Sequence, residues 1–246
     1  MKEMILKWED FKYPTEEEVL AILKEIPTLS DFGFKIKNPT DIFFINKSTR
    51  NQDILRSDHL RWWNFCLGNR FGRLRQTFEY VLVHFNRGIS IDFNTDSPQI
   101  MLNSILFDYY AEIFYYLYFS SLDIIAQILN LYFMLGIDEK KVDFVKILSS
   151  DITIKSTLIE MNESIKDTRD CRNAFTHRFT PTLNDPRIIL IKDGNMEALG
   201  MGSGKRFELD FILENIKEST QILADLMNCL KEYVEKDTDN NYYLFE

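Results

Sequence analysis

The longest apolar stretch of this 246-residue chain, from Ile100 to Leu135, constrains the fold more than any other feature. Three carboxylates interrupt it, Asp108, Glu112 and Asp123, whereas a membrane-spanning helix needs about 20 nearly uncharged residues. We therefore expect a buried core helix and no association with a membrane.

Further helices are predicted on both sides of this core helix, which starts at Ser97 and Pro98 and ends before Gly136. Helical spacing of apolar residues and capping signals place them at about residues 15–26, 52–86 (one helix, or two with a break at 68–72), 142–148, 156–179 and 210–236. Residues 187–192 and 196–201 are typical of a β-hairpin with its turn at Asp193 and Gly194, and a short strand is predicted at 42–45.

Composition supports the same all-α fold. Only 9 Gly and 6 Pro stand against 45% hydrophobic and 14% aromatic residues, which favours long elements with few turns. The cysteines Cys66, Cys171 and Cys229 lack any CxxC spacing, so we expect neither a disulfide framework nor a zinc cluster. No signal peptide is evident at the start of the sequence, and we expect a cytoplasmic location.

Charge is distributed unevenly. The formal net charge of −9 disfavours nonspecific binding to nucleic acid. The segment from Arg56 to Arg87 nevertheless contains six arginines and only two carboxylates, Asp58 and Glu79. It is therefore the best candidate for a locally basic surface. Within it, Trp62 and Trp63 either stack on bases or pack in the core, and the sequence leaves both interpretations open. His59 and His84 are isolated, and we assign them no role.

The segment TRDCRNAFTHRF carries the candidate chemistry. Stepping along the predicted helix by three and four residues, from Leu158 through Thr168 to Phe175, puts Arg172 on the inward face. A buried arginine needs a carboxylate or a bound anion, which the three acids of the core helix could supply. A neighbouring polar face suits a phosphate and contains Lys166, Arg169, Asn173 and His177.

The sequence Arg172-Asn173-x-x-x-His177 resembles the Arg-(polar)-x-x-x-His motif of the HEPN superfamily of helical nucleotide-binding and RNA-cleaving domains. The stretch from Ser120 to Phe133, with Asp123 before aliphatic positions, is similar to the preceding helix of that superfamily. The resemblance covers roughly Ser97 to Lys236. It implies an N-terminal helical extension, residues 1–95, packed on a HEPN-like helical bundle, residues 96–246, which contains the small hairpin.

The resemblance implies a metal-independent endoribonuclease that needs no cofactor and acts as a homodimer, in defence or stress response such as a toxin–antitoxin pair. In this role His177 is the general acid and base, Arg172 stabilises the phosphate and Asn173 positions it. Asp123 would orient Arg172, and Arg169 extends the cationic edge. In some members a tyrosine two residues after the histidine is modified with AMP; Phe179 stands there and puts that regulation in doubt.

Other interpretations stay open. Residues five apart on an ideal helix point about 140° from each other, so Arg172 and His177 converge only if the helix ends near Thr176 or a second protomer completes the site. The motif could instead be a structural ion pair in a non-catalytic module that binds a protein or a nucleotide. A metal site at the three acids of the core helix is a further alternative, but no histidine joins them at a useful spacing.

Overall fold

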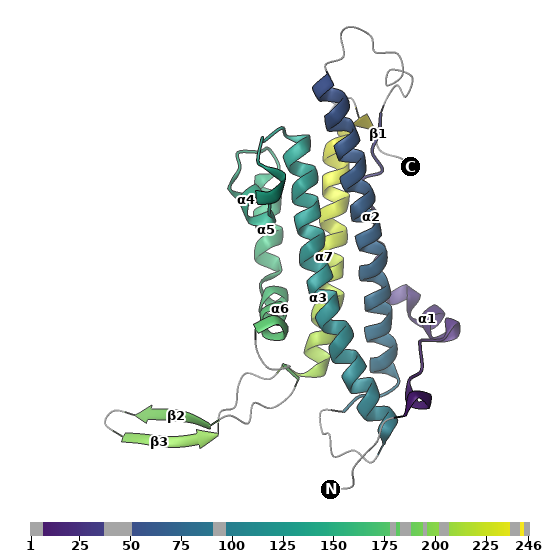
Figure 1. Cartoon of the computed structure of the whole chain (residues 1–246), viewed down its shortest axis with the longest axis vertical. Helices are drawn as coiled ribbons and strands as arrows, with labels where there is room; N and C mark the ends of the chain where they lie inside the picture. Colours follow the sequence, from purple (N-terminus) through teal and green to yellow (C-terminus); the bar gives the residue numbers. More distant parts are fainter. Residues whose placement is uncertain are drawn as a thin grey trace. The chain divides into compact units, whose positions relative to one another are not determined.

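The computed structural model describes residues 7–36, 51–90, 97–177, 181–182, 188–193, 196–201, 207–236 and 242–243. Within these ranges the chain forms seven α-helices and two small sheets of two strands each (Figure 1). The predicted all-α fold with a small hairpin is confirmed. The helices are α1 (Glu16–Ile22), α2 (Asn51–Asn86), α3 (Pro98–Tyr132), α4 (Phe144–Ser149), α5 (Lys155–Ser164), α6 (Lys166–His177) and α7 (Leu209–Lys236).

The chain divides into two compact units, and each is built from parts of the three long helices. Unit 1 comprises Met1–Glu25, Thr77–Tyr115 and Asp167–Glu218. Unit 2 comprises Ile26–Gln76, Tyr116–Lys166 and Ser219–Glu246. The helices α2, α3 and α7 therefore each contribute one part to the core of unit 1 and the other part to the core of unit 2.

Helix α3 is the buried core helix that the sequence predicts. In unit 1 its Phe114 ring meets Phe78 of α2 edge-on, with 5.9 Å between ring centroids. In unit 2 the carbonyl oxygen of Tyr132 accepts a hydrogen bond from Arg56 of α2 at 3.2 Å, and its ring packs on Tyr233 of α7 at 6.4 Å. Among the described residues, no helix combines the length and the apolar character that crossing a membrane requires.

The ends of α3 follow from local signals. The Ser97 hydroxyl accepts a hydrogen bond from the Ile100 amide at 3.4 Å, and Pro98 is the first helical residue. The helix ends at Tyr132, slightly before the predicted Leu135, because the chain turns with positive φ at Met134 (52°) and Gly136 (68°).

Helix α2 continues through Gly68 and Gly72 without a break. Of the two predicted alternatives, one helix or two, the single helix is therefore correct. The last helix, α7, begins one residue before the predicted Asp210. A short helix was also predicted at 142–148, and the structure has α4 there, with the Asp143 carboxylate capping it by accepting from the Lys146 amide at 2.8 Å.

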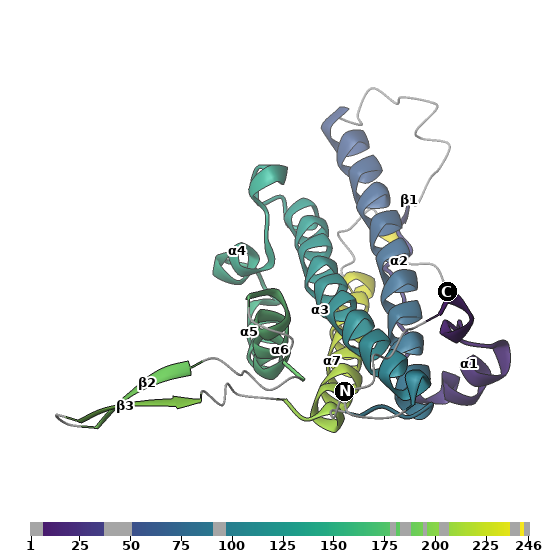
Figure 2. The ribbon, with the colours of Figure 1, turned by 60° about the horizontal axis from the view of Figure 1, so that its bottom comes forward.

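Two short antiparallel pairs complete the structure. In unit 1, β2 (Ile188–Asp193) pairs with β3 (Met196–Met201), which confirms the predicted hairpin (Figure 2). In unit 2, β1 (Lys35–Ile36) pairs with β4 (Tyr242–Tyr243), so the aromatic end of the chain docks on its own N-terminal region. The strand predicted at 42–45 lies outside the described residues.

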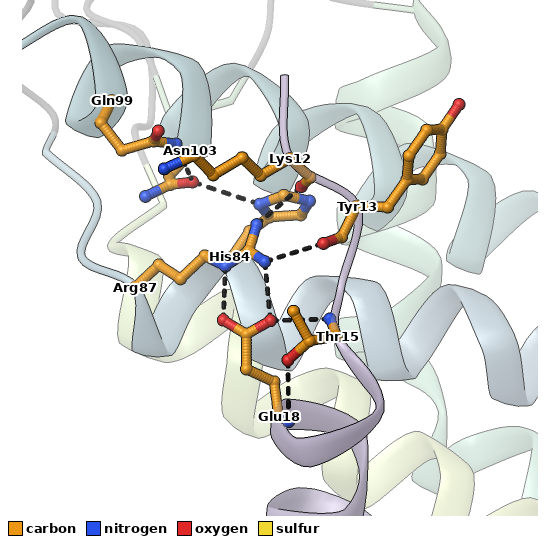
Figure 3. A network of polar contacts seen from close by, with 8 residues as sticks. All are labelled: Lys12, Tyr13, Thr15, Glu18, His84, Arg87, Gln99 and Asn103. Atoms are coloured by element: carbon orange, nitrogen blue, oxygen red, sulfur yellow. Dashed lines mark hydrogen bonds and ion pairs between the residues drawn. The ribbon is translucent and has the colours of Figure 1, made fainter. Parts of the chain in front are cut away.

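A polar network in unit 1 fixes α1 against the end of α2 (Figure 3). The Arg87 guanidinium donates two hydrogen bonds to the Glu18 carboxylate, each 2.7 Å long, and further bonds to the carbonyl oxygens of Lys12 and Tyr13. The predicted capping box of α1 is present as well, because Thr15 and Glu18 exchange hydrogen bonds between side chain and backbone.

His84 lies in the same region. It is 1% exposed, and its Nδ1 lies 3.3 Å from the Asn103 Oδ1 (Figure 3). Its ring also stacks on Tyr110, with 5.8 Å between centroids. Burial lowers the pKa of His84, so the neutral ring is favoured. His84 is therefore a core residue with satisfied polar contacts.

We expect Glu18→Gln to lower the free energy of unfolding by about 1 kcal/mol at pH 7, a value reduced because the Glu18 side chain is 34% exposed. The hydrogen bonds from Arg87 lower the pKa of Glu18 from 4.5 to about 2. A lowered folded-state pKa gives stability that is complete above pH 4.5 and is lost as the pH falls toward 2. In urea unfolding, the difference between wild type and variant should therefore be smaller at pH 3 than at pH 7. Glu17→Gln, at an exposed position of the same turn, is the control, and an equal effect of both substitutions would contradict the role of Arg87.

Candidate functional site

The candidate motif lies on α6, a short helix that is separate from α5. The sequence pattern predicted one helix from about Ser156 to Phe179, and this is wrong: α5 ends at Ser164, and Ile165 takes a non-helical conformation with φ −94° and ψ 23°. The Ser164 hydroxyl donates to the carbonyl oxygen of Glu160 at 3.0 Å, a contact that competes with regular helix geometry and often bends it. The described part of α6 ends at His177, and Phe179 lies outside the described residues.

One face of α6 is buried in unit 1. It consists of Thr168, Cys171, Ala174 and Phe175, of which Cys171 is 0% exposed. This spacing of three, three and one is typical of a single helical face. The interior of unit 1 therefore fixes the rotation of α6 about its own axis.

Two residues that the sequence analysis did not single out hold this buried face. The Tyr115 hydroxyl of α3 donates to Asn215 of α7 at 3.0 Å, and the Asn215 amide donates to the Thr168 hydroxyl at 3.5 Å. The Tyr115 ring also contacts Phe175, with 5.7 Å between centroids. Burial raises the pKa of Tyr115 well above its ordinary value, so its hydroxyl stays protonated and available as a donor. The only signal in the sequence was a polar Asn215 within the apolar face of α7.

The opposite, partly exposed face of α6 carries the predicted polar residues. Arg169, Arg172 and Asn173 are half-buried and Thr176 is exposed, and their spacing of three, one and three puts them on one stripe. The backbone of His177 lies at the C-terminal end of α6, and the side chain of His177 is not among the described parts of the structure.

The predicted inward position of Arg172 is met in part, because its Nε atom is buried whereas the fully buried position at this turn belongs to Cys171. The apolar periodicity that begins at Leu158 crosses Ile165, and the interruption of the helix there shifts which residues of α6 face inward. Arg172 is half-buried, which leaves part of its side chain in contact with solvent.

The three acids of α3 lie in different environments. Asp123 is exposed, and one of its carboxylate oxygens accepts a hydrogen bond from the Phe144 amide of α4 at 3.2 Å in unit 2. Its predicted role in orienting Arg172 stays a prediction. Glu112 is exposed, and Asp108 is half-buried in unit 1. In the described part of the chain, no group of three or more His, Cys, Asp or Glu residues gathers where it could hold a metal ion.

Asp108 fixes the chain shortly after the motif. One carboxylate oxygen accepts a hydrogen bond from the Thr182 hydroxyl at 2.7 Å, and the other is buried with no hydrogen-bond partner among the described residues. Burial raises the pKa of Asp108 from 3.8 to about 6, although the bond from Thr182 opposes this shift. Beside Thr182, the Pro181 carbonyl oxygen accepts from the Phe207 amide at 3.0 Å, so the chain leaving α6 is tied to the start of α7.

We expect Asp108→Asn to stabilise the protein by about 1 to 2 kcal/mol at pH 8, because the neutral amide avoids burying a charge and can still accept from Thr182. A raised folded-state pKa gives stability that is complete below pH 3.8 and is lost as the pH rises through about 6. The advantage of the variant should therefore disappear at pH 4. Thermal unfolding at both pH values measures this, with Glu112→Gln as the control one turn along α3. An advantage of equal size at pH 4 and pH 8 would exclude titration of Asp108 as its cause.

Fold and motif together define the class of this protein as an all-α domain with an Arg-(polar)-x-x-x-His motif that ends a short helix, as in the HEPN superfamily. Comparison with protein families matches residues 63–240, well over half of the chain, to the family described as Cthe2314-like HEPN. The chain belongs to this HEPN family. No curated protein and no solved structure matches it.

The family match begins within α2, earlier than the resemblance expected from Ser97 onward. Most of α2 therefore belongs to the matched region. The division of the chain at residue 95 into an extension and a core domain stays a prediction.

Proposed function

We propose that this protein is a metal-independent endoribonuclease of HEPN type. The observation that supports it is the arrangement of α6 in unit 1. Its buried face is held by Tyr115 and Asn215, while Arg169, Arg172, Asn173 and Thr176 share a partly exposed face that leads to His177 at the helix end. A rigid helix that presents cationic and hydrogen-bonding groups to solvent is suited to holding a phosphodiester.

In the proposed reaction the protein positions the RNA and transfers protons. The ribose 2′-hydroxyl attacks phosphorus, the bond from phosphorus to the 5′-oxygen breaks, and the products carry a 2′,3′-cyclic phosphate and a 5′-hydroxyl. His177 takes the proton of the 2′-hydroxyl or gives one to the leaving oxygen. Arg172 binds the charge that develops on the phosphate oxygens, and Asn173 donates a hydrogen bond to the same group.

A homodimer belongs to this proposal for a geometric reason. Within one α-helix, Arg172 and His177 point about 140° from each other, so a single regular helix does not bring them to the same phosphate. Two copies of the motif, one from each protomer, provide an arginine and a histidine on the two sides of one substrate.

A second candidate function is a non-catalytic module that binds a protein or a nucleotide. It is supported by the half-burial of Arg172, which also suits a structural role, and by the net charge of −9, which disfavours nonspecific contact with RNA. The two functions differ in whether RNA is cut at all, so cleavage distinguishes them directly.

We expect the purified protein to cleave a mixed-sequence single-stranded RNA in excess EDTA and to leave 2′,3′-cyclic phosphate ends. His177→Ala and Arg172→Ala should each lower the rate at least about 100-fold, the size typical of losing a general acid and base or a charge-stabilising group. Gel electrophoresis of end-labelled RNA, with enzymatic analysis of the new ends, measures both. Arg172→Lys keeps the charge without the planar fork and should recover only part of the activity.

The controls are a histidine and a cation outside the proposed chemistry. His59→Ala replaces an exposed histidine of α2, and Lys140→Ala removes an exposed charge that is not on α6. Both should cleave like wild type, and circular dichroism should show that every variant is folded. Absence of cleavage, or cleavage that persists in both motif variants, would refute the nuclease and leave the binding module.

A further inference from the structure

An exposed stripe of polar and aromatic side chains runs along the part of α2 that belongs to unit 2. Its members are spaced by three, four, four and three residues, which places them on one helical face: Trp62, Phe65, Asn69, Arg73 and Gln76. All five side chains are exposed. Trp62 is 58% exposed and Phe65 is 60% exposed, and their ring centroids lie 5.9 Å apart. At a rise of 1.5 Å per residue the stripe is about 21 Å long. We call it the α2 stripe.

Two neighbouring hollows make this surface a groove. One, with a volume of about 530 Å³, is lined by Phe65, Asn69, Arg73 and Gln76 of the stripe and by Asp31. The other, of about 350 Å³, lies beside it between residues 29–31 and α2 and reaches Arg75.

Glycines keep the groove open. Gly68 and Gly72 border both hollows. A Cβ at Gly68 would lie 2.5 Å from an oxygen of Asp31, whereas a Cβ at Gly72 would meet nothing within 4 Å. The Asp31 carboxylate therefore lies close to the helix at Gly68, and the helix surface is bare at Gly72. Residues 29–31 lie outside the matched region 63–240, so the family match does not imply this groove.

The local charge is positive although the chain is acidic. Between Leu55 and Gln76, α2 carries five arginines and one carboxylate, Asp58, which gives 5 − 1 = +4. The carboxylate in the groove, Asp31, is partly offset by Lys231 of α7, whose ammonium donates to the Ser30 hydroxyl. Burial lowers the pKa of Lys231, and the charge of Asp31 opposes that shift.

We propose that the α2 stripe is a binding surface for single-stranded RNA. The proposal rests on the proposed function, since RNA is the substrate class of that function. The Arg73 and Arg75 guanidiniums bind phosphates, the exposed rings of Phe65 and Trp62 stack on unpaired bases, and Asn69 and Gln76 donate and accept hydrogen bonds along the strand. Exposed aromatic rings on the stripe, with Arg73 beside them and Arg75 at the neighbouring hollow, are features that bind single strands without reading their sequence. Paired bases are not available for such stacking, so a duplex should bind more weakly.

The test measures binding apart from cleavage. Fluorescence anisotropy of a mixed-sequence, fluorescein-labelled single-stranded RNA is titrated in EDTA with the full-length His177→Ala protein, over a range of salt concentrations. Adding Arg73→Gln and Arg75→Gln together should weaken binding at least about 10-fold and reduce the slope of log affinity against log salt by about 1.4, two lost phosphate contacts of about 0.7 each. Phe65→Ala should weaken binding about 10-fold with an unchanged slope, as expected for one lost stacked base.

Matched controls come from the same unit. Lys140→Gln with Lys141→Gln removes two exposed charges elsewhere, and Tyr116→Ala removes a ring that is 71% exposed on α3. Both should bind RNA like the parent protein. Equal weakening by the arginine pair and the lysine pair would overturn the proposal in favour of net charge alone. Unchanged RNA affinity in the α2 variants, together with a shift in oligomeric state by light scattering, would overturn it in favour of an interface between copies.

The outcome is independent of the nuclease test. If wild type cuts RNA and the α2 variants bind and cut it normally, this inference alone fails. If RNA binds through the α2 stripe but is never cut, the surface is supported and the nuclease is refuted.

Discussion

Burial of α3 is the constraint on which the rest of the structure depends. The helix is apolar on nearly every side, and its buried residues include Phe107, Phe114, Tyr115, Tyr118, Ile125 and Leu129. Removing such a surface from water is worth roughly 25 cal/mol per Å², so other helices must cover it. In unit 1 that cover includes α2, α6 and α7; in unit 2 it includes α2, α4 and α7. Packing against the apolar surface of α3 is therefore what the buried residues of α2 and α7 contribute to the fold.

The position of the motif follows from the same constraint. Because α6 contributes to the cover of α3 through Phe175 and Cys171, its opposite face is left partly in solvent, and that face carries Arg169, Arg172 and Asn173. In the core, hydrogen bonds join Tyr115 to Asn215 and Asn215 to Thr168. Such bonds fix orientation as well as distance, so they orient α6 more strictly than apolar contacts alone would. The packing of the core thus sets which polar groups α6 offers to a ligand.

Much of this fold could be predicted from the sequence because the signals were local. Ser97 and Pro98 start α3, the capping box at Thr15 starts α1, and the two apolar runs before and after Asp193-Gly194 predict the pairing of β2 with β3. The features that could not be predicted depended on geometry between residues farther apart in the sequence. A non-helical Ile165 interrupts an otherwise continuous pattern without a proline or glycine to mark it, so the periodicity does not predict that Cys171 is the fully buried residue beside Arg172. The contacts of Asp108 with Thr182 and of Tyr115 with Asn215 join segments far apart in the chain, which no spacing rule reveals.

The proposed binding of RNA by an acidic chain is physically consistent, because net charge and local charge act over different distances. At physiological salt the field of an exposed charge is screened within about 8 Å, so a phosphate at one surface responds to the charges lining that surface and hardly to those elsewhere. The two hollows beside the α2 stripe are lined by Arg73, Arg75 and Asp31, which gives 2 − 1 = +1 within a chain of −9. The acidic remainder weakens nonspecific attraction from a distance and leaves short-range contacts with arginines and aromatic rings intact. Binding on such a surface depends on those specific contacts, so a strand must reach both the cations and the rings before it is held.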